Sequence, residues 1–164
     1  MKVLDFGCGT GSNSKLFNPE DYIGSEVDSS RVESSGVKYP KYKFKKIPII
    51  NSSKDKLPWA DNSFDMIFVS LCLHHINAKS CKLIFKEFRR VLKSNGKILG
   101  IEPALIDGKY FSNILMNILD AGDYILPLDK YKDMYKSESF TTTHINIVKT
   151  LSLIHISEPT RRKH

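Results

Sequence analysis

Three glycines at alternate positions, Gly7, Gly9 and Gly11, follow a short apolar run that contains Asp5. Glycine allows the backbone to turn sharply and to approach a ligand with no side chain in between. A helix that begins just after such a loop presents N–H groups to an anion, which could be a pyrophosphate or a carboxylate. The dinucleotide-binding pattern G-x-G-x-x-G needs a glycine where this chain has Ser12, so the spacing argues against a dinucleotide. The alternative is a tight turn that holds no ligand.

Two acidic residues, Glu26 and Asp28, stand at the end of the next apolar run. A carboxylate at the end of a strand can accept hydrogen bonds from both hydroxyls of a ribose. Glu26 is the first candidate for this contact, and Asp28 is the second because it shares the same face of a continuing strand. Either acid alone could be an ordinary surface residue. Together with the glycine loop they favour a nucleoside ligand.

A pair of histidines, His74 and His75, follows the longest apolar run and supplies candidates for a general base. The alternative is that the pair opens a helix, with one ring packed and the other solvated. Adjacent histidines are poor zinc ligands without further partners, so we expect no metal site. Cys8 and Cys72 have no charged activator nearby in the sequence, and we expect neither to be a nucleophile.

The candidate residues each follow an apolar run, so they can form one site only if a sheet brings the ends of these runs together. Strands are predicted at residues 2–7, 21–28, 43–50, 63–73, 97–103 and 143–150, and helices at 12–17, 78–96 and 110–122. Apolar strands that alternate with helices predict an α/β fold with a parallel sheet covered on both faces. In such sheets a ligand lies beyond the carboxyl ends of the strands. The candidates for chemistry therefore follow Phe6, Ile23, Val69 and Ile101.

Composition narrows the class of protein. The 164 residues are 41% hydrophobic and 26% charged, which is typical of one soluble domain. The net charge is +7, of which the tail 151–164 contributes +2; the rest is spread over many lysines, so we expect solubility rather than nucleic-acid binding. No apolar run approaches the roughly 18 residues of a membrane span, and no secretory leader is visible. The cysteines (Cys8, Cys72 and Cys81) form no CxxC pair, which predicts neither a disulfide framework nor a zinc site. We expect a cytoplasmic protein.

Four motifs together resemble the class I S-adenosylmethionine-dependent methyltransferases of the small-molecule type. They are "VLDFGCGTG", "YIGSE", "LPWADNSFDMIFVSLCLHHI" and "EFRRVLKSNGKILGIEP", in this order over residues 3–103. The resemblance implies a Rossmann-like, doubly wound and mostly parallel sheet of seven strands, with the last strand antiparallel. It also implies S-adenosylmethionine as cofactor and a small molecule as methyl acceptor.

The resemblance further implies which residues bind the cofactor. The methionine part would be bordered by Asp5, Gly7, Cys8, Gly9 and Gly11 from the first loop, and by Ser70, Leu71 and Cys72 after the fourth strand. Glu26, with Asp28 as its substitute, would hold the ribose. The family's usual D-A-x-x-L-P pattern near the adenine is broken, because Ser53 stands four positions before Leu57. Asn51 and Asp55 are possible replacements.

The two ends of the chain differ from the family pattern. The tail at 151–164 begins "LSLIHISEPTR", which resembles a translated sequencing adapter, so we predict a methyltransferase core at 1–150 and a non-native tail. The alternative is a genuine last strand. Only Met1 and Lys2 precede the first strand, where relatives carry a helix. We therefore expect a sheet incomplete at both ends, with weakened stability and binding.

A substrate-side insert is expected after Pro103, with candidate pocket residues Asp120, Gly122, Asp123, Tyr124 and Tyr131; an ordinary helix packed on the sheet is the alternative. Two other functions are weighed. One is a nicotinamide-dependent oxidoreductase, against which Ser12 counts. The other is a non-catalytic methyltransferase-like fragment. Nucleic-acid modification rests on charge alone.

Overall fold

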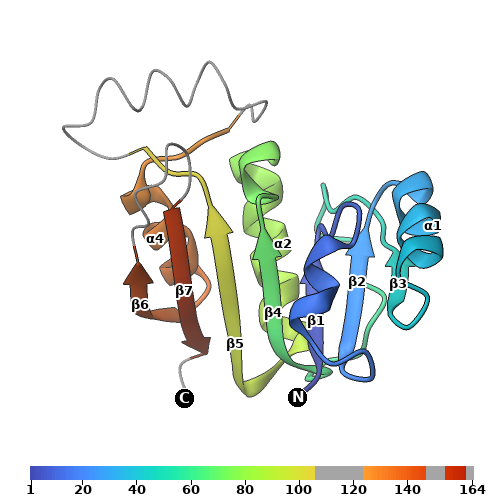
Figure 1. Cartoon of the computed structure of the whole chain (residues 1–164). Coiled ribbons are helices and arrows are strands. Elements are labelled where there is room, and N and C mark those ends of the chain that lie inside the picture. Colours follow the sequence, from blue (N-terminus) through green and yellow to red (C-terminus); the bar gives the residue numbers. More distant parts are fainter. Residues whose placement is uncertain (106–123, 147–153, 162–164) are drawn as a thin grey trace.

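The computed structural model describes residues 1–105, 124–146 and 154–161. A seven-stranded sheet in the order β3-β2-β1-β4-β5-β7-β6 forms the centre of the molecule (Figure 1). The strands are β1 (Val3–Phe6), β2 (Tyr22–Glu26), β3 (Lys43–Lys46), β4 (Phe64–Ser70), β5 (Leu92–Glu102), β6 (Phe140–Asn146) and β7 (Ile154–Arg161). The first five strands are parallel, and β7 is antiparallel to both of its neighbours. This arrangement confirms the predicted α/β, Rossmann-like sheet.

The helices are η1 (Ser12–Leu16), α1 (Ser29–Lys38), η2 (Leu73–His75), α2 (Ala78–Val91) and α4 (Leu128–Ser137). The sequence predicted a helix at 78–96, but α2 ends at Val91. Leu92 leaves the helix because its buried side chain and its pairing with Phe64 start β5 directly. The α1 helix was not predicted. The predicted helix at 110–122 lies outside the described residues.

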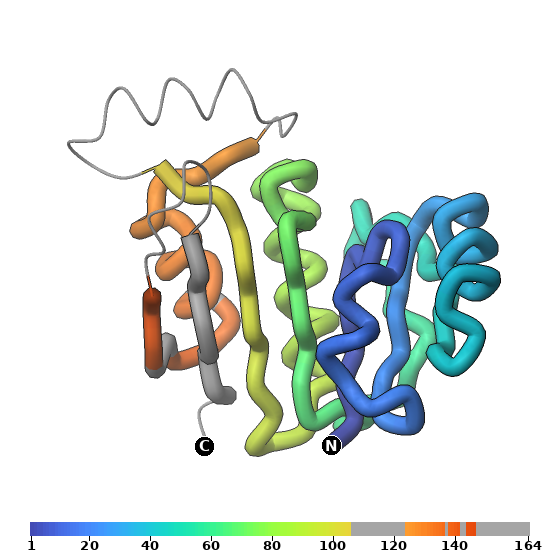
Figure 2. The backbone as a smooth tube through the Cα atoms, in the orientation of Figure 1, coloured from blue at the N-terminus to red at the C-terminus, as the bar shows by residue number. Residues whose placement is uncertain are grey.

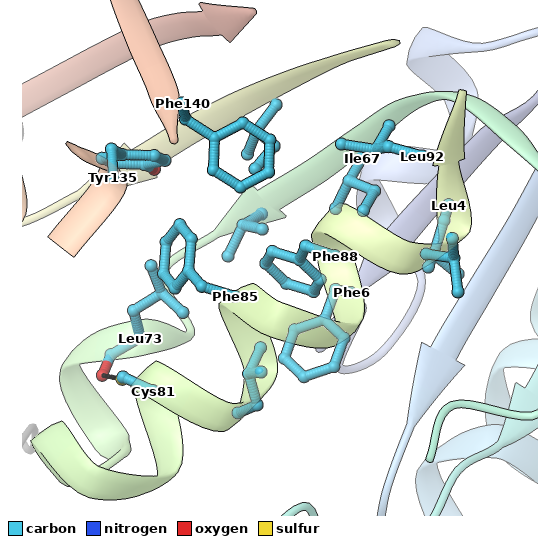
Figure 3. Packing of buried hydrophobic residues seen from close by; sticks show 14 of the residues in the cluster. Leu4, Phe6, Ile67, Leu73, Cys81, Phe85, Phe88, Leu92, Tyr135 and Phe140 are labelled. Atoms are coloured by element: carbon cyan, nitrogen blue, oxygen red, sulfur yellow. Dashed lines mark hydrogen bonds between the residues drawn. The ribbon is translucent and has the colours of Figure 1, made fainter. Parts of the chain in front are cut away.

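Alternation along the strands divides their side chains between two covered faces. On one face, Phe6 of β1 packs edge-on against Phe88 of α2, with ring centroids 4.9 Å apart. On the same face, Phe85 of α2 meets Tyr135 of α4 at 4.8 Å (Figure 3). On the other face, Phe17 follows η1 and its ring packs against Phe68 of β4 at 5.4 Å. Aromatic contacts therefore pack both faces of the central strands β1 and β4.

The carboxyl ends of the five parallel strands lie at one end of the sheet, and the N-terminus lies at the opposite end (Figure 2). The loops after β1, β2, β3 and β4 meet at these carboxyl ends. Strand β3 is the outermost strand of the sheet and ends at Lys46, two residues before Pro48, as suits a proline that cannot donate to a neighbouring strand. None of the helices in the described ranges has the length and apolar character needed to cross a membrane.

Strand β7 falls within the tail predicted to be non-native. It fills the place between β5 and β6, pairing Ile154 with Glu102 and Ile156 with Ile145. All seven strands implied by the resemblance are thus described, so the expectation of an incomplete sheet was wrong. The non-native origin of 151–164 stays a prediction, since this pairing is also what a genuine last strand would show.

Candidate cofactor cleft

An open cleft of about 860 Å³ lies at the carboxyl ends of the parallel strands. The loops after β1, β2, β3 and β4 line it, together with the start of α2 and Tyr124. Glu26 and Arg31 supply the only Asp, Glu, Lys or Arg side chains among the described lining residues. The described lining therefore holds a single carboxylate, and it lies beside the glycine loop.

The three glycines of the loop have different reasons to be glycine. All have positive φ, at 69°, 54° and 74° for Gly7, Gly9 and Gly11. A side chain at Gly7 would overlap Cys72 Sγ, and one at Gly11 would lie 2.7 Å from the Phe44 ring. A Cβ at Gly9 would meet nothing within 4 Å, and Gly9 lines the cleft. Gly7 and Gly11 thus serve internal packing, whereas Gly9 leaves space for a ligand.

The N–H groups of this loop are already bonded inside the protein. Those of Gly7 and Cys8 donate to the Ser25 carbonyl at 2.9 and 3.0 Å, and that of Gly11 donates to the Cys8 carbonyl at 2.9 Å. The Gly9 N–H donates to Glu26 Oε2 at 3.0 Å. At these positions the loop offers a ligand room rather than the hydrogen-bond donors that an anion would need.

Glu26 ends β2 and lines the cleft, with 7% of the residue exposed. Its Oε2 accepts from the Gly9 N–H, and its Oε1 accepts from the N–H groups of Val27 at 2.7 Å and Asp28 at 3.3 Å. Each carboxylate oxygen has two lone pairs, so Oε2 can accept one further hydrogen bond. Glu26 therefore fixes the glycine loop and still has acceptor capacity toward the cleft.

Asp28, the second candidate for the ribose contact, has a different role in the structure. It caps α1 by accepting from the N–H groups of Ser30 at 2.8 Å and Arg31 at 3.4 Å. The hydroxyl of Ser30 also donates to it, and these bonds lower the pKa of the Asp28 carboxyl. Asp28 does not line the cleft. The structure thus separates the two acids.

Asp5 is fully buried beneath the glycine loop and does not line the cleft. Its Oδ2 accepts from the Tyr22 hydroxyl at 2.7 Å, and its Oδ1 has no hydrogen-bond partner. Burial raises the pKa of Asp5 to about 7; the Tyr22 bond opposes this rise and the nearby Glu26 adds to it. Asp5 supports the loop from below.

Ser53, which stands at the family's adenine position, and its possible replacements Asn51 and Asp55 all lie outside the cleft. Asp55 closes a turn by accepting from the N–H groups of Asn51 at 3.0 Å and Ser52 at 2.8 Å. An apolar wall that was not predicted lies beside Glu26 and includes Val27 and the segment 47–50. Its signal was the run "IPII" directly after a predicted strand.

The loop after β4 forms the opposite end of the cleft. Ser70, Leu71 and Cys72 all line it, and Leu71 has a left-handed backbone with φ of 52°. Burial raises the pKa of the Cys72 and Cys8 thiols well above their usual range, which keeps both protonated. This agrees with the expectation that neither is a nucleophile. Tyr124, from the expected insert, also lines this end.

The two histidines face different surroundings. His75 is exposed and lines the cleft, whereas His74 is 3% exposed and its Nδ1 lies 2.8 Å from Glu102 Oε2. This matches the alternative in which one ring is packed and the other solvated. Glu102 was missed by sequence reasoning, although it ends a predicted strand, as Glu26 does. The described residues contain no group of three or more metal-ligating side chains.

The other candidate pocket residues of the insert do not line the cleft or are not described. Tyr131 is buried in the core and does not line the cleft. Asp120, Gly122 and Asp123 lie outside the described residues.

Comparison with known proteins identifies the family. A family model described as a methyltransferase domain matches residues 4–100. The chain is 28% identical over 102 residues to a malonyl-[acyl-carrier protein] O-methyltransferase of Legionella pneumophila, covering 60% of this chain and 34% of that protein. It is 32% identical over 114 residues to a sterol 24-C-methyltransferase of Gibberella zeae, covering 67% and 29%. The chain thus spans about a third of the length of these relatives.

Solved structures share the fold. A SAM-dependent methyltransferase from Methanosarcina mazei superposes with a TM-score of 0.80 at 16% identity, covering 99% of this chain and 93% of that one. A geranyl diphosphate C-methyltransferase from Streptomyces coelicolor, solved with S-adenosyl-L-homocysteine, gives 0.76 at 10% identity, covering 98% and 69%. With the matching family model, these findings set aside the oxidoreductase alternative. The chain belongs to the class I S-adenosylmethionine-dependent methyltransferases.

Proposed function

We propose that this chain binds S-adenosylmethionine in the cleft and transfers its methyl group to a small-molecule acceptor. The observation that carries the proposal is the pairing of Glu26 with Gly9. The carboxylate keeps acceptor capacity beside the one glycine of the loop whose side-chain position is open space. When bound, S-adenosylmethionine supplies a methyl group already activated on a sulfonium, so the protein has mainly to bind and align.

The residues present fit the nucleoside part of this cofactor. The remaining acceptor position of Glu26, on Oε2, suits a ribose hydroxyl, which is a hydrogen-bond donor. Val27 and Ile49 line the same part of the cleft and are 43% and 67% exposed, so they offer apolar surface to a flat base. Neither Asp28 nor Asp55 contributes, because their carboxylates are used in a helix cap and a turn.

The other end of the cleft indicates the character of the acceptor. Leu71 and Tyr124 line it and are 44% and 43% exposed. The printed names of the relatives and structural neighbours specify a malonyl-acyl-carrier-protein, a sterol and geranyl diphosphate. We therefore propose a small-molecule acceptor with an apolar part that packs against Leu71 and Tyr124. If the acceptor is a hydroxyl or a carbon acid, His75 is the side chain placed to take its proton.

Calorimetric titration tests the proposal on the full chain. S-adenosylhomocysteine is the probe, and NAD⁺ is the comparison ligand because it shares the adenosine but carries a pyrophosphate. We expect binding of S-adenosylhomocysteine alone. Failure of a folded sample to bind it would favour the non-catalytic alternative, and tighter binding of NAD⁺ would contradict the assignment of the loop.

A further inference from the structure

Glu102, the last residue of β5, holds one loop by several contacts. Its Oε1 accepts from the N–H groups of Cys72 at 2.9 Å and Leu73 at 2.8 Å. Its Oε2 lies 2.8 Å from Nδ1 of His74 and 3.4 Å from that residue's backbone nitrogen. The residue is 1% exposed and does not line the cleft, so it cannot touch a ligand there.

The loop held in this way is strained. Leu71 adopts a left-handed backbone, with φ of 52°, which costs a residue with a side chain roughly 1–2 kcal/mol. Its N–H donates to the carbonyl of Ile101 at 2.8 Å, so the last two residues of β5 fasten both sides of the turn. The strain persists because these bonds fix the backbone. As a result, the Leu71 side chain stays on the cleft wall.

The same carboxylate orients an imidazole. A carboxylate has no hydrogen to donate, so the contact places the hydrogen of His74 on Nδ1. The His74 ring packs against the His75 ring, with centroids 4.0 Å apart and planes at 44°. The carbonyl of His74 accepts from the Tyr124 N–H at 2.9 Å. The position of His74 therefore bears on two cleft residues, His75 and Tyr124.

We propose that Glu102 is a positioning residue of the cleft: through two backbone N–H groups and the His74 ring it sets the places of Leu71 and His75. The effect of Glu102 on ligand binding rests on the proposed function. The contacts by which Glu102 holds the loop do not depend on that function. Glu102 acts through the loop, whereas Glu26 acts on the ligand.

The test uses Glu102→Gln in the full chain. The Gln oxygen can still accept from Cys72 and Leu73, which leaves its NH₂ group facing His74. Because NH₂ can only donate, we expect the His74 hydrogen to move from Nδ1 to Nε2, which imidazole ¹⁵N chemical shifts report. We also expect the affinity for S-adenosylhomocysteine to fall by about tenfold, as for loss of one hydrogen bond to a charged group.

The matched control is Glu87→Gln. Glu87 is also buried, at 8% exposure, and like Glu102 does not line the cleft. It accepts from the Leu57 N–H at 2.7 Å and pairs with Arg90, so its partners lie away from the loop after β4. Its loss should lower stability and leave the His74 tautomer and the affinity unchanged. Equal loss of affinity in both variants, or an unchanged His74 tautomer in Glu102→Gln, would overturn the proposal.

The wild-type chain provides a second measurement in case the variant does not fold. It should show His74 with hydrogen on Nδ1 and slow hydrogen exchange at the amides of Cys72 and Leu73. Hydrogen on Nε2 or fast exchange at both amides would overturn the proposal. If the wild type fails to bind S-adenosylhomocysteine but shows these signatures, the proposed function fails and the positioning of the loop by Glu102 stands.

Discussion

Two strand ends at the same edge of the sheet each carry a nearly buried glutamate. Glu26 ends β2 and Glu102 ends β5, with exposures of 7% and 1%. Both carboxylates accept backbone N–H groups from a neighbouring loop. Only Glu26 lines the cleft. Glu102 lies beside His74, whereas Glu26 lies beside the open space at Gly9.

The difference shows that an acid at a strand end is not by itself a ligand contact. What decides is whether lone pairs remain on the side that faces the cleft after the protein's own N–H groups are bonded. Asp28 and Asp5 show the same point. Asp28 caps α1 and Asp5 is buried beneath the glycine loop, so neither lines the cleft, although both are close in sequence to residues that do.

The largest expected effect is at the open position beside Glu26. Gly9→Val should abolish binding of S-adenosylhomocysteine, because the side chain would fill the cleft. The positive φ of 54° adds roughly 1–2 kcal/mol of strain, which thermal unfolding would report. Gly36→Ala is the control, since that helical glycine also has open space and should gain roughly 0.5–1 kcal/mol without changing affinity. Retained affinity in Gly9→Val would remove the loop from the site.

A smaller effect separates the neighbouring acids. Glu26→Gln should weaken the binding of S-adenosylhomocysteine by roughly 10- to 100-fold. This is equivalent to about 1.5–3 kcal/mol, the contribution of hydrogen bonds to a charged group. Asp28→Asn should leave the dissociation constant within about threefold, because Asn also caps helices well. Calorimetry on the two variants gives the ranking. The reverse order would move the ribose contact to Asp28.

The third effect concerns Asp5, the acid that is buried beneath the glycine loop and does not line the cleft. The pKa of Asp5, raised from 3.8 to about 7, means that the folded state binds a proton that the unfolded state releases. Its contribution to stability is present below pH 3.8 and is lost as pH rises through about 7. The free energy of unfolding should therefore fall by about 2 kcal/mol from this group between roughly pH 5 and 7.5. Urea denaturation of wild type and Asp5→Asn measures it; equal pH slopes would contradict this account.

The smallest effect is at the strained turn held by Glu102. Leu71→Gly should change the free energy of unfolding by less than about 1 kcal/mol, because relief of strain offsets the added freedom of the unfolded chain. It should nevertheless remove an apolar side chain from the cleft wall. Thermal unfolding checks the first statement. A large destabilisation would mean that the turn is not strained.

Local patterns predicted much of the fold and part of the cleft. The glycine loop, the strand at Phe64–Ser70 and the acid at Glu26 are visible in short windows because their residues are adjacent in the chain. The α1 helix was missed because it is rich in serine, and its capping acid, Asp28, was interpreted as a ligand contact. Glu102 was missed because its partner His74 lies 28 residues away, brought close only by the pairing of β4 with β5.

The central claim is that the nucleoside part of the cofactor binds where Gly9 and Glu26 meet, not at Asp28 or Asp55. Amide chemical shifts of the ¹⁵N-labelled full chain, followed during titration with S-adenosylhomocysteine, test this most directly. We expect the largest changes at Gly9, Val27 and Ile49, with little change at Asp55. Changes confined to residues outside the cleft, or no change in a folded sample, would contradict the account.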